Sequence, residues 1–133
     1  MCGITGIFSV DGKEIKENWI IDSLKSLSKR GPDFQSYQSF NNACLGHARL
    51  SIIDTSSAAN QPFVDVNNEW TIVYNGEIFN FKELRSDLEK KGIQFRTSSD
   101  TEVLLELYKF YGKECLHQLN GFWAFAIYNH KEE

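Results

Sequence analysis

Cys2 is the first residue of the sequence that could do chemistry, because it directly follows Met1. Removal of Met1 would leave a thiol and a free α-amino group on the same residue. A side-chain nucleophile with an N-terminal amine as its base is an established catalytic arrangement, known for threonine. Cys2 is therefore a candidate nucleophile, provided that the rest of the sequence supplies a site around it.

A second candidate is the stretch VYNGEIFN at residues 73–80. Asn-Gly between apolar residues is typical of a two-residue β-hairpin. Alternatively, the side-chain amide of Asn75 and the backbone N–H of Gly76 could donate hydrogen bonds to one developing negative oxygen, which is an oxyanion hole. Because Asn80 is already expected to begin a helix, few residues remain for a returning strand, and this disfavours the hairpin.

Arg49 and Asp100 are charged residues in informative places. Arg49 lies within the apolar stretch ARLSII and needs a fixed anion, for which a carboxylate is the natural partner. Asp100 is expected at a helix start, where the helix dipole favours an acid, but where it could also reach a substrate ammonium group. His47 would share the face of Arg49 in an extended strand, and such a histidine is more often structural than catalytic.

Composition and charge exclude several classes of protein. A chain of 133 residues with 41% hydrophobic residues is long enough for one domain with its own core. The net charge of -4 and the lack of a basic run argue against a nucleic-acid-binding surface. The apolar run at residues 122–128 is far shorter than the ~18 residues that a membrane span needs. With no signal-peptide pattern at the start, we expect a cytoplasmic protein.

The cysteines do not form a recognisable framework. There are three of them, an odd number, and no CxxC pair, so neither a disulfide framework nor a zinc site is expected. Cys44 and Cys115 are instead expected to be small, buried, apolar side chains.

Apolar periodicity predicts the elements that must position these residues. Their order is strand, helix, hairpin, strand, helix, strand, helix, strand, which is typical of a mixed sheet with helices packed on it. The predicted ranges are a strand at 3–10, a helix at 16–29, hairpin strands at 34–40 and 43–53, a surface loop at 54–68, a strand at 69–75, a helix at 80–92, a short strand at 94–97, a helix at 99–112 and a strand at 121–129.

Local signals add detail to three of these elements. Asn80 with Glu83, and Ser99 with Glu102, have the spacing of a helix capping box. The strand at 121–129 has no polar face, which predicts cover on both sides.

Six motifs in a fixed order identify a family. MCGI at the start, RGPD near 30, HARLSIID near 50, NGEIFN near 75, SSDTEV near 100 and LNGFWAFAIYN near 120 resemble the glutamine amidotransferase domain of the asparagine synthetase family. This is the class II type with an N-terminal nucleophile, and the resemblance runs from Cys2 to about Asn129. It implies an α+β fold, a four-layer αββα sandwich of the N-terminal-nucleophile hydrolase type. Residues 1–133 would be one such domain, incomplete at its C-terminal end.

The resemblance implies catalytic roles for three residues. Cys2 would attack the side-chain amide of glutamine and form a γ-glutamyl thioester, with its own α-amino group as the base. Asn75 and Gly76 would hold the oxyanion of the tetrahedral intermediate. While Met1 remains attached, the nitrogen of Cys2 is an amide and cannot take a proton, so little or no glutaminase activity is expected of an unprocessed chain.

The resemblance also implies how the substrate is bound. Arg49 would grip the α-carboxylate of glutamine, and Glu77 and Asp100 would hold its α-amino end. No metal or organic cofactor is implied for this chain, and ATP and Mg²⁺ are expected only for the synthetase domain that is absent from it. The implied partners are L-glutamine and that synthetase domain, with neither nucleic acid nor a membrane, and a homodimer is left open.

The implied function is a glutaminase that supplies ammonia to an ATP-dependent, asparagine-synthetase-like domain. Two alternatives stay open. The ammonia acceptor could be a sugar or a natural product in a related amidotransferase. The chain could also be a non-catalytic module that binds glutamine or regulates another domain.

Overall fold

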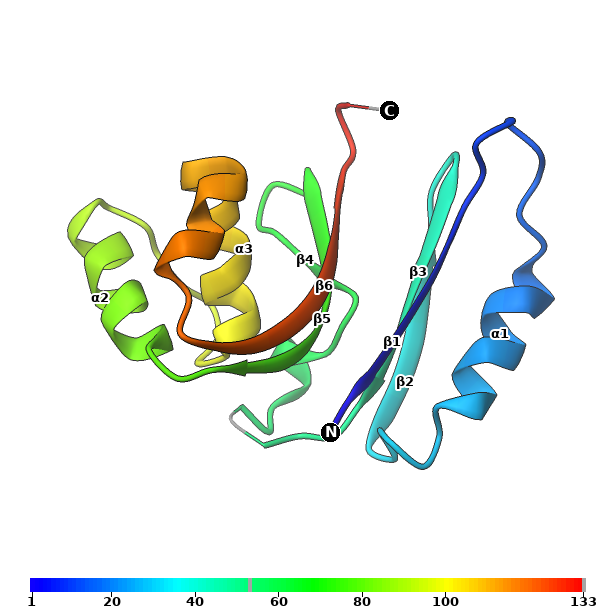
Figure 1. The fold of residues 1–133 in the computed structure, drawn as a ribbon, viewed down its shortest axis with the longest axis horizontal. Helices are drawn as coiled ribbons and strands as arrows, with labels where there is room; N and C mark the ends of the chain where they lie inside the picture. The colour runs from blue at the N-terminus through cyan, green and yellow to red at the C-terminus, as the bar shows by residue number, and fades with distance from the viewer. Residues whose placement is uncertain (53, 133) are drawn as a thin grey trace.

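The computed structural model describes residues 1–52 and 54–132, and these form four layers (Figure 1). Helix α1 (Glu17–Ser26) forms one outer layer. Two β-sheets lie face to face in the middle, and α2 (Phe81–Lys90) and α3 (Asp100–Tyr111) form the other outer layer. The α+β class expected from the sequence is confirmed. No helix in the described part of the chain is both long and apolar enough to cross a bilayer.

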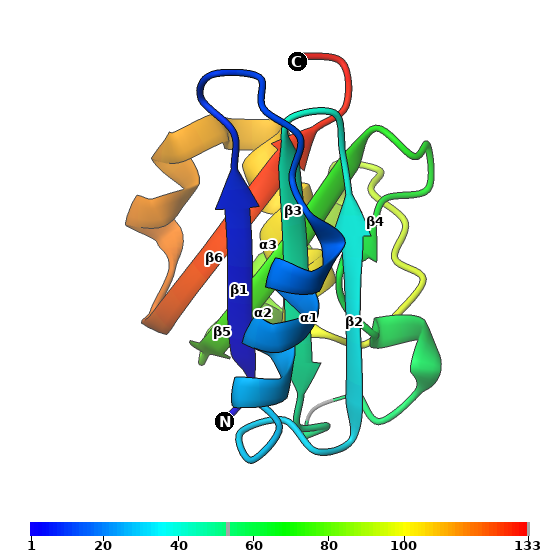
Figure 2. The ribbon, with the colours of Figure 1, turned by 90° about the vertical axis from the view of Figure 1, so that its right-hand side faces the viewer.

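The first sheet has the order β1 (Gly3–Phe8), β3 (Ala43–Arg49), β2 (Phe34–Ser39), and both pairs are antiparallel. All residues of the central strand β3 are buried, because α1 covers its outer face (Figure 2) and the second sheet covers its inner face. The predicted hairpin is thus confirmed. Its second strand ends at Arg49 instead of continuing to position 53, which lies outside the described residues.

The second sheet has the order β4 (Phe63–Val64), β5 (Trp70–Ile78), β6 (Gly121–Asn129), again antiparallel. Side chains of β5 pack against α2 and α3 in the main apolar core, which includes Tyr74, Leu88 and Leu104. Strand β5 continues through Asn75 and Gly76, which pair with β6. The Asn-Gly pair therefore forms no hairpin, as the early helix start indicated.

Two predicted segments differ from the structure. The loop predicted at residues 54–68 contains a short 3-10 helix, η1 (Ser57–Ala59), and strand β4. The short strand predicted at 94–97 is absent from the described elements. Its backbone N–H groups at Arg96 and Thr97 donate to the Glu102 carboxylate at 2.9 and 2.7 Å and are not used in strand pairing.

The two predicted capping boxes have different outcomes. Ser99 caps α3, since its hydroxyl accepts a hydrogen bond from the Glu102 N–H at 3.2 Å. Asn80 makes no side-chain cap for α2, so this prediction was wrong. Its side-chain amide instead donates to the Gln118 carbonyl and accepts from the Asn120 N–H, both at 2.9 Å. This ties the start of α2 to the segment between η2 (Gly112–Gln118) and β6.

The predicted complete cover of β6 is also wrong. Strand β6 is an edge strand of its sheet among the described residues, and its first residues extend beyond the edge of the first sheet (Figure 2). Phe122 is consequently 50% exposed and contacts the exposed ring of Phe79 edge-on. The burial predicted for Cys44 and Cys115 is confirmed, and both thiols are free.

His47 of β3 links the two sheets. The side chain is fully buried, and its Nε2 lies 3.0 Å from the Tyr74 carbonyl of β5. Because a carbonyl only accepts, Nε2 carries the hydrogen and donates it. Nδ1 has no hydrogen-bond partner among the described residues. Burial lowers the pKa of His47 to about 4, so the ring is neutral at physiological pH. This contact agrees with the structural role that the sequence favoured.

We expect acid to destabilise the protein through His47. Its folded-state pKa of about 4 lies below the ordinary value of 6.5, so the unfolded chain takes up the proton first as the pH falls. The stability linked to the neutral ring is therefore complete above about pH 6.5 and is lost between there and about pH 4. The loss in the free energy of unfolding is at most about 3 kcal/mol, measurable by urea unfolding across this range.

Two variants isolate this effect from the titration of carboxylates. His47→Gln should remove the part of the pH dependence that arises from this ring, giving a flatter curve between about pH 6.5 and pH 4. His117→Gln, which changes a largely exposed side chain, should keep the wild-type curve. An unchanged slope in His47→Gln would contradict the prediction.

Candidate functional site

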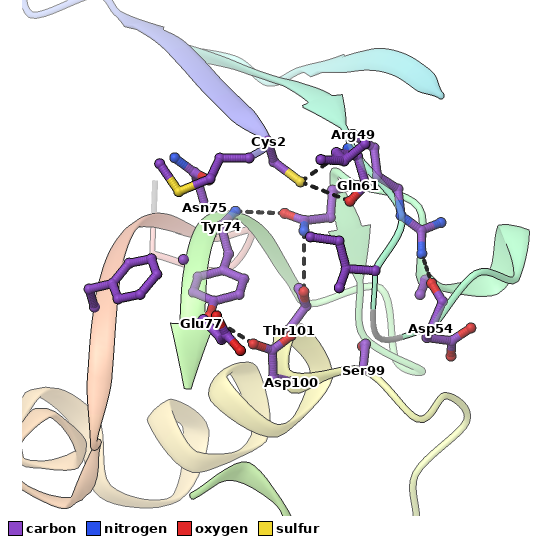
Figure 3. A pocket seen from close by; sticks show the side chains of 16 residues that line it. Cys2, Arg49, Asp54, Gln61, Tyr74, Asn75, Glu77, Ser99, Asp100 and Thr101 are labelled. Carbon is purple, nitrogen blue, oxygen red and sulfur yellow. Dashed lines mark hydrogen bonds between the residues drawn. The ribbon is translucent and has the colours of Figure 1, made fainter. Parts of the chain in front are cut away.

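One pocket brings together residues from both sheets and from the start of α3 (Figure 3). Its cavity volume is about 110 Å³. Because one water molecule needs roughly 10–15 Å³, there is room for several waters or a small ligand. The residues predicted from the sequence that line it are Cys2, Arg49, Asn75, Gly76, Glu77 and Asp100. All six therefore meet at one place, although they are distributed along the chain from position 2 to position 100.

Cys2 precedes β1, and its thiol is held by the residue that follows β3. The Leu50 N–H donates to the sulfur at 3.2 Å, and the thiol donates to the Leu50 carbonyl at 3.4 Å. Arg30 Nε also donates to the Cys2 carbonyl, at 3.2 Å. The Cys2 side chain is partly buried and lines the pocket beside Met1. The sulfur thus faces the pocket and is not enclosed in either core.

Asn75 and Gly76 belong to β5 and pair with β6 on one side. In an antiparallel strand, the backbone N–H groups of alternate residues point to the same edge. Those of Tyr74 and Ile78 donate to side chains that are not part of β6. The N–H of Gly76, which lies between them, therefore also points away from β6. Since both Asn75 and Gly76 line the pocket, a backbone donor and a side-chain amide are available there.

Arg49 is the last residue of β3 and is buried. Its guanidinium donates to the carbonyls of Ser56, at 2.8 Å, and of Asp54, and to the side-chain oxygen of Asn60. The sequence led us to expect a carboxylate as its partner, whereas these three oxygens are neutral. The contacts fix the guanidinium against the loop that follows β3. Because none of the three oxygens is charged, they do not neutralise the positive charge of Arg49.

Asp100 is the first residue of α3 and is only 5% exposed. Its Oδ2 accepts hydrogen bonds from the Tyr74 hydroxyl at 2.8 Å and from the Ile78 N–H at 3.4 Å. Burial raises the pKa of Asp100, and these hydrogen bonds oppose the rise. Glu77 on β5 is exposed and lines the same pocket. Both interpretations of Asp100 are thus compatible, because it begins a helix and also reaches the pocket.

Gln61 and Thr101 also line the pocket but were not identified from the sequence. The Gln61 side-chain oxygen accepts from the Tyr74 N–H at 2.6 Å, and its side-chain nitrogen donates to the Thr101 hydroxyl at 3.2 Å. Gln61 lies just before β4, so its side chain takes the place of a backbone carbonyl where β4 no longer pairs with β5. Glutamine in a polar stretch carries no local signal of such a role.

The residues that line the pocket therefore include a thiol, a guanidinium and three carboxyl groups, those of Asp54, Glu77 and Asp100. Such a set suits a zwitterion with a carbonyl group, since it offers a cation, anions and a nucleophile. No cluster of three or more potential metal ligands occurs within residues 1–52 and 54–132.

Comparison with known proteins gives the same assignment over the whole chain. A family model described as a glutamine amidotransferase domain matches residues 1–133. Asparagine synthetase [glutamine-hydrolyzing] 3 of Bacillus subtilis (strain 168) is 38% identical over 134 residues, 98% of this chain and 22% of that protein. Asparagine synthetase B [glutamine-hydrolyzing] of Escherichia coli (strain K12) is 36% identical over 135 residues, 100% of this chain and 24% of that protein. The chain thus spans about a fifth to a quarter of the length of these curated relatives.

Solved structures support the fold. Glutamine phosphoribosylpyrophosphate amidotransferase from Bacillus subtilis, complexed with ADP and GMP, matches with a TM-score of 0.58 and 29% identity, over 96% of this chain and 29% of that one. The sequence motifs, the family model and this solved structure all indicate a glutamine amidotransferase domain. The chain therefore belongs to the class II glutamine amidotransferase domain family and is similar, over its whole length, to the N-terminal domain of asparagine synthetases.

Proposed function

We propose that the chain is a glutaminase domain that hydrolyses L-glutamine to L-glutamate and ammonia. The observation that carries the proposal is that the Cys2 thiol lies in one pocket with the guanidinium of Arg49 and the carboxylate of Asp100. A free amino acid carries an α-carboxylate and an α-ammonium group, so its ends match these charges.

Substrate binding would use the two charged groups of glutamine, which lie at the opposite end from its reacting side-chain amide. Arg49, anchored by loop carbonyls, binds the α-carboxylate. Asp100 and Glu77 bind the α-ammonium group. Holding both charged groups fixes the amide carbon near the sulfur, and such positioning can supply roughly 7–11 kcal/mol of the barrier at most.

The reaction would begin once Met1 has been removed. The free α-amine of Cys2 takes the thiol proton, as suits a base whose pKa in peptides is about 7.7–8.0. The sulfur attacks the amide carbon, and the amide of Asn75 and the N–H of Gly76 hold the resulting oxyanion. The intermediate collapses when the protonated amine returns its proton to the leaving nitrogen. Ammonia departs, a γ-glutamyl thioester remains, and water then releases glutamate and restores the thiol.

The ammonia would serve a second domain of a longer protein. The relatives named above are asparagine synthetases, and this supports an ATP-dependent synthetase domain as the recipient. ATP and Mg²⁺ would belong to that domain, while this chain needs no cofactor for the steps above. The named similarity to a phosphoribosylpyrophosphate amidotransferase keeps a sugar-type acceptor as the alternative.

Labelling with a diazoketone analogue of glutamine tests the proposal on the natural protein with Met1 removed. We expect one adduct per chain, located on the N-terminal peptide by mass spectrometry, together with release of glutamate from glutamine. Cys44 and Cys115 are buried internal controls and should stay unlabelled. A processed protein that neither releases glutamate nor takes up the analogue at Cys2 would overturn the proposal.

A further inference from the structure

We propose that Tyr74 is a positioning residue that makes the pocket selective for ligands with an α-ammonium group, by holding the carboxylate of Asp100. The inference rests on the proposed function for the kind of ligand. The inference goes beyond the proposed function because it gives a role to Tyr74, which neither the motifs nor the proposed chemical steps require.

Tyr74 is fixed by hydrogen bonds at all three of its polar groups. Its N–H donates to the Gln61 side chain at 2.6 Å, and its carbonyl accepts from His47 at 3.0 Å. Its hydroxyl donates to Asp100 Oδ2 at 2.8 Å. The three partners come from three different segments, and Tyr74 is only 3% exposed. The hydroxyl is therefore held at a defined point beside the pocket.

The hydroxyl fixes the orientation of Asp100. Both Tyr74 and the Ile78 N–H donate to the same carboxylate oxygen, Oδ2. The shorter of the two contacts is the one from Tyr74, so the tyrosine sets how the carboxylate is turned relative to the pocket. Loss of that donor would leave Oδ2 with the longer, 3.4 Å contact from the Ile78 N–H.

The hydroxyl also helps to keep Asp100 charged. Burial raises the pKa of Asp100, and the largest opposing effect is the hydrogen bond from Tyr74. Tyr74 itself remains a donor at physiological pH, because burial and the nearby Asp100 carboxylate raise its own pKa. Only an ionised Asp100 attracts an ammonium group strongly. Removing the hydroxyl should therefore weaken the part of binding that depends on the ligand's amine.

Two ligands that differ only in the amine test this claim. L-glutamine carries the α-ammonium group, whereas glutaramate has the same carboxylate and carboxamide without it. Binding is measured by calorimetry on the natural protein carrying Cys2→Ala, so that no turnover occurs. In Tyr74→Phe we expect the Kd of glutamine to rise about tenfold, as for a lost hydrogen bond to a charged group, while the Kd of glutaramate stays within about twofold.

Matched variants separate positioning from a structural effect. Tyr108→Phe makes the same change on α3, outside the pocket, and should alter neither Kd. A variant with 4-aminophenylalanine at position 74 keeps a donor there and should recover most of the affinity for glutamine. It also serves if the phenylalanine variant is poorly folded, which thermal unfolding would reveal. Equal weakening of both ligands, or no change in either, would overturn the inference.

The pH dependence of binding provides an independent readout. The other ionisable side chains that line the pocket with Asp100 and Tyr74 are Asp54, Glu77 on β5, Arg49 at the end of β3 and Cys2, which is alanine here. Without the Tyr74 hydroxyl, the acid limb of the glutamine Kd should move to higher pH, because Asp100 then takes up a proton more readily. An acid limb that does not move would count against the inference.

The outcome is distinguishable from that of the proposed function. Binding that shows the expected selectivity, together with no release of glutamate by the Cys2 protein, would reject hydrolysis and support the role of Tyr74. If the Cys2 protein hydrolyses glutamine but Tyr74→Phe prefers glutamine over glutaramate as strongly as the wild type does, hydrolysis is supported and the role of Tyr74 is rejected. A wild-type pocket that binds glutamine no better than glutaramate would overturn the inference directly.

Discussion

Cys2→Ala is expected to abolish glutamine hydrolysis and to leave glutamine binding in place. The nucleophile is the one group that the proposed pathway cannot replace, so we expect kcat to fall by at least about 10⁴-fold. Arg49 and Asp100, which would bind the substrate, are untouched by the change. Release of glutamate from the processed natural protein measures the first effect, and calorimetry with L-glutamine measures the second.

Cys44→Ala is the matched control for this variant. Cys44 lies in β3, is buried away from the pocket and does not line it. The same substitution there should leave kcat unchanged. It should lower the free energy of unfolding only by the contribution of one small buried side chain. A Cys2→Ala protein that hydrolyses glutamine at the wild-type rate would remove the basis of the mechanism.

Gly76→Ala is expected to disrupt both the sheet and the oxyanion site. An added Cβ would lie 2.2 Å from the Phe122 carbonyl oxygen and 2.7 Å from the Trp123 Cα. Both atoms are backbone of β6, so no side-chain rotation can relieve the overlap, and β5 and β6 must separate locally. We expect a loss of about 3 kcal/mol or more in the free energy of unfolding, and a large fall in glutaminase activity as the N–H moves. Urea unfolding and glutamate release measure the two effects.

Gly6→Ala provides the comparison within another strand. There the added Cβ would meet Leu45 Cδ2 at 3.1 Å, and this is the end of a side chain that can move. The expected loss is about 1 kcal/mol or less, with activity retained. If Gly76→Ala were as stable and as active as Gly6→Ala, the close backbone approach would not have the importance that we give it.

Local sequence patterns predicted most elements because those elements are stabilised by nearby residues. The helix at 99–112 was found as α3 from its apolar spacing and from Ser99, which does cap it. The strand at 69–75 was found but ended too early, at the Asn-Gly pair. Its continuation to Ile78 depends on pairing with β6, which lies more than forty residues further along the chain and gives no local signal.

The candidate site shows the same division between local and distant information. Cys2 could be singled out by its place after Met1, and Asn75 by the glycine that follows it. Their meeting in one pocket follows from the packing of the two sheets. Gln61 and Tyr74 escaped notice because their hydrogen bonds reach segments far away in the sequence. The cap predicted at Asn80 was wrong for the same reason. Its side chain binds Gln118 and Asn120, close to β6, and does not cap the helix that begins beside it.

The proposed nucleophile and the proposed oxyanion donors are carried by different sheets. Cys2 precedes β1 of the first sheet, whereas Gly76 is part of β5 in the second. Their separation is therefore set by the thickness of the layer in which Leu45 and Val73 are buried, and neither sheet determines it alone. A misplacement of about 1 Å can slow a reaction by about 10²-fold. The kcat of the proposed reaction would thus depend strongly on the spacing between the two sheets. Substitutions that change the volume of side chains between the sheets would lower kcat even though every pocket residue is kept.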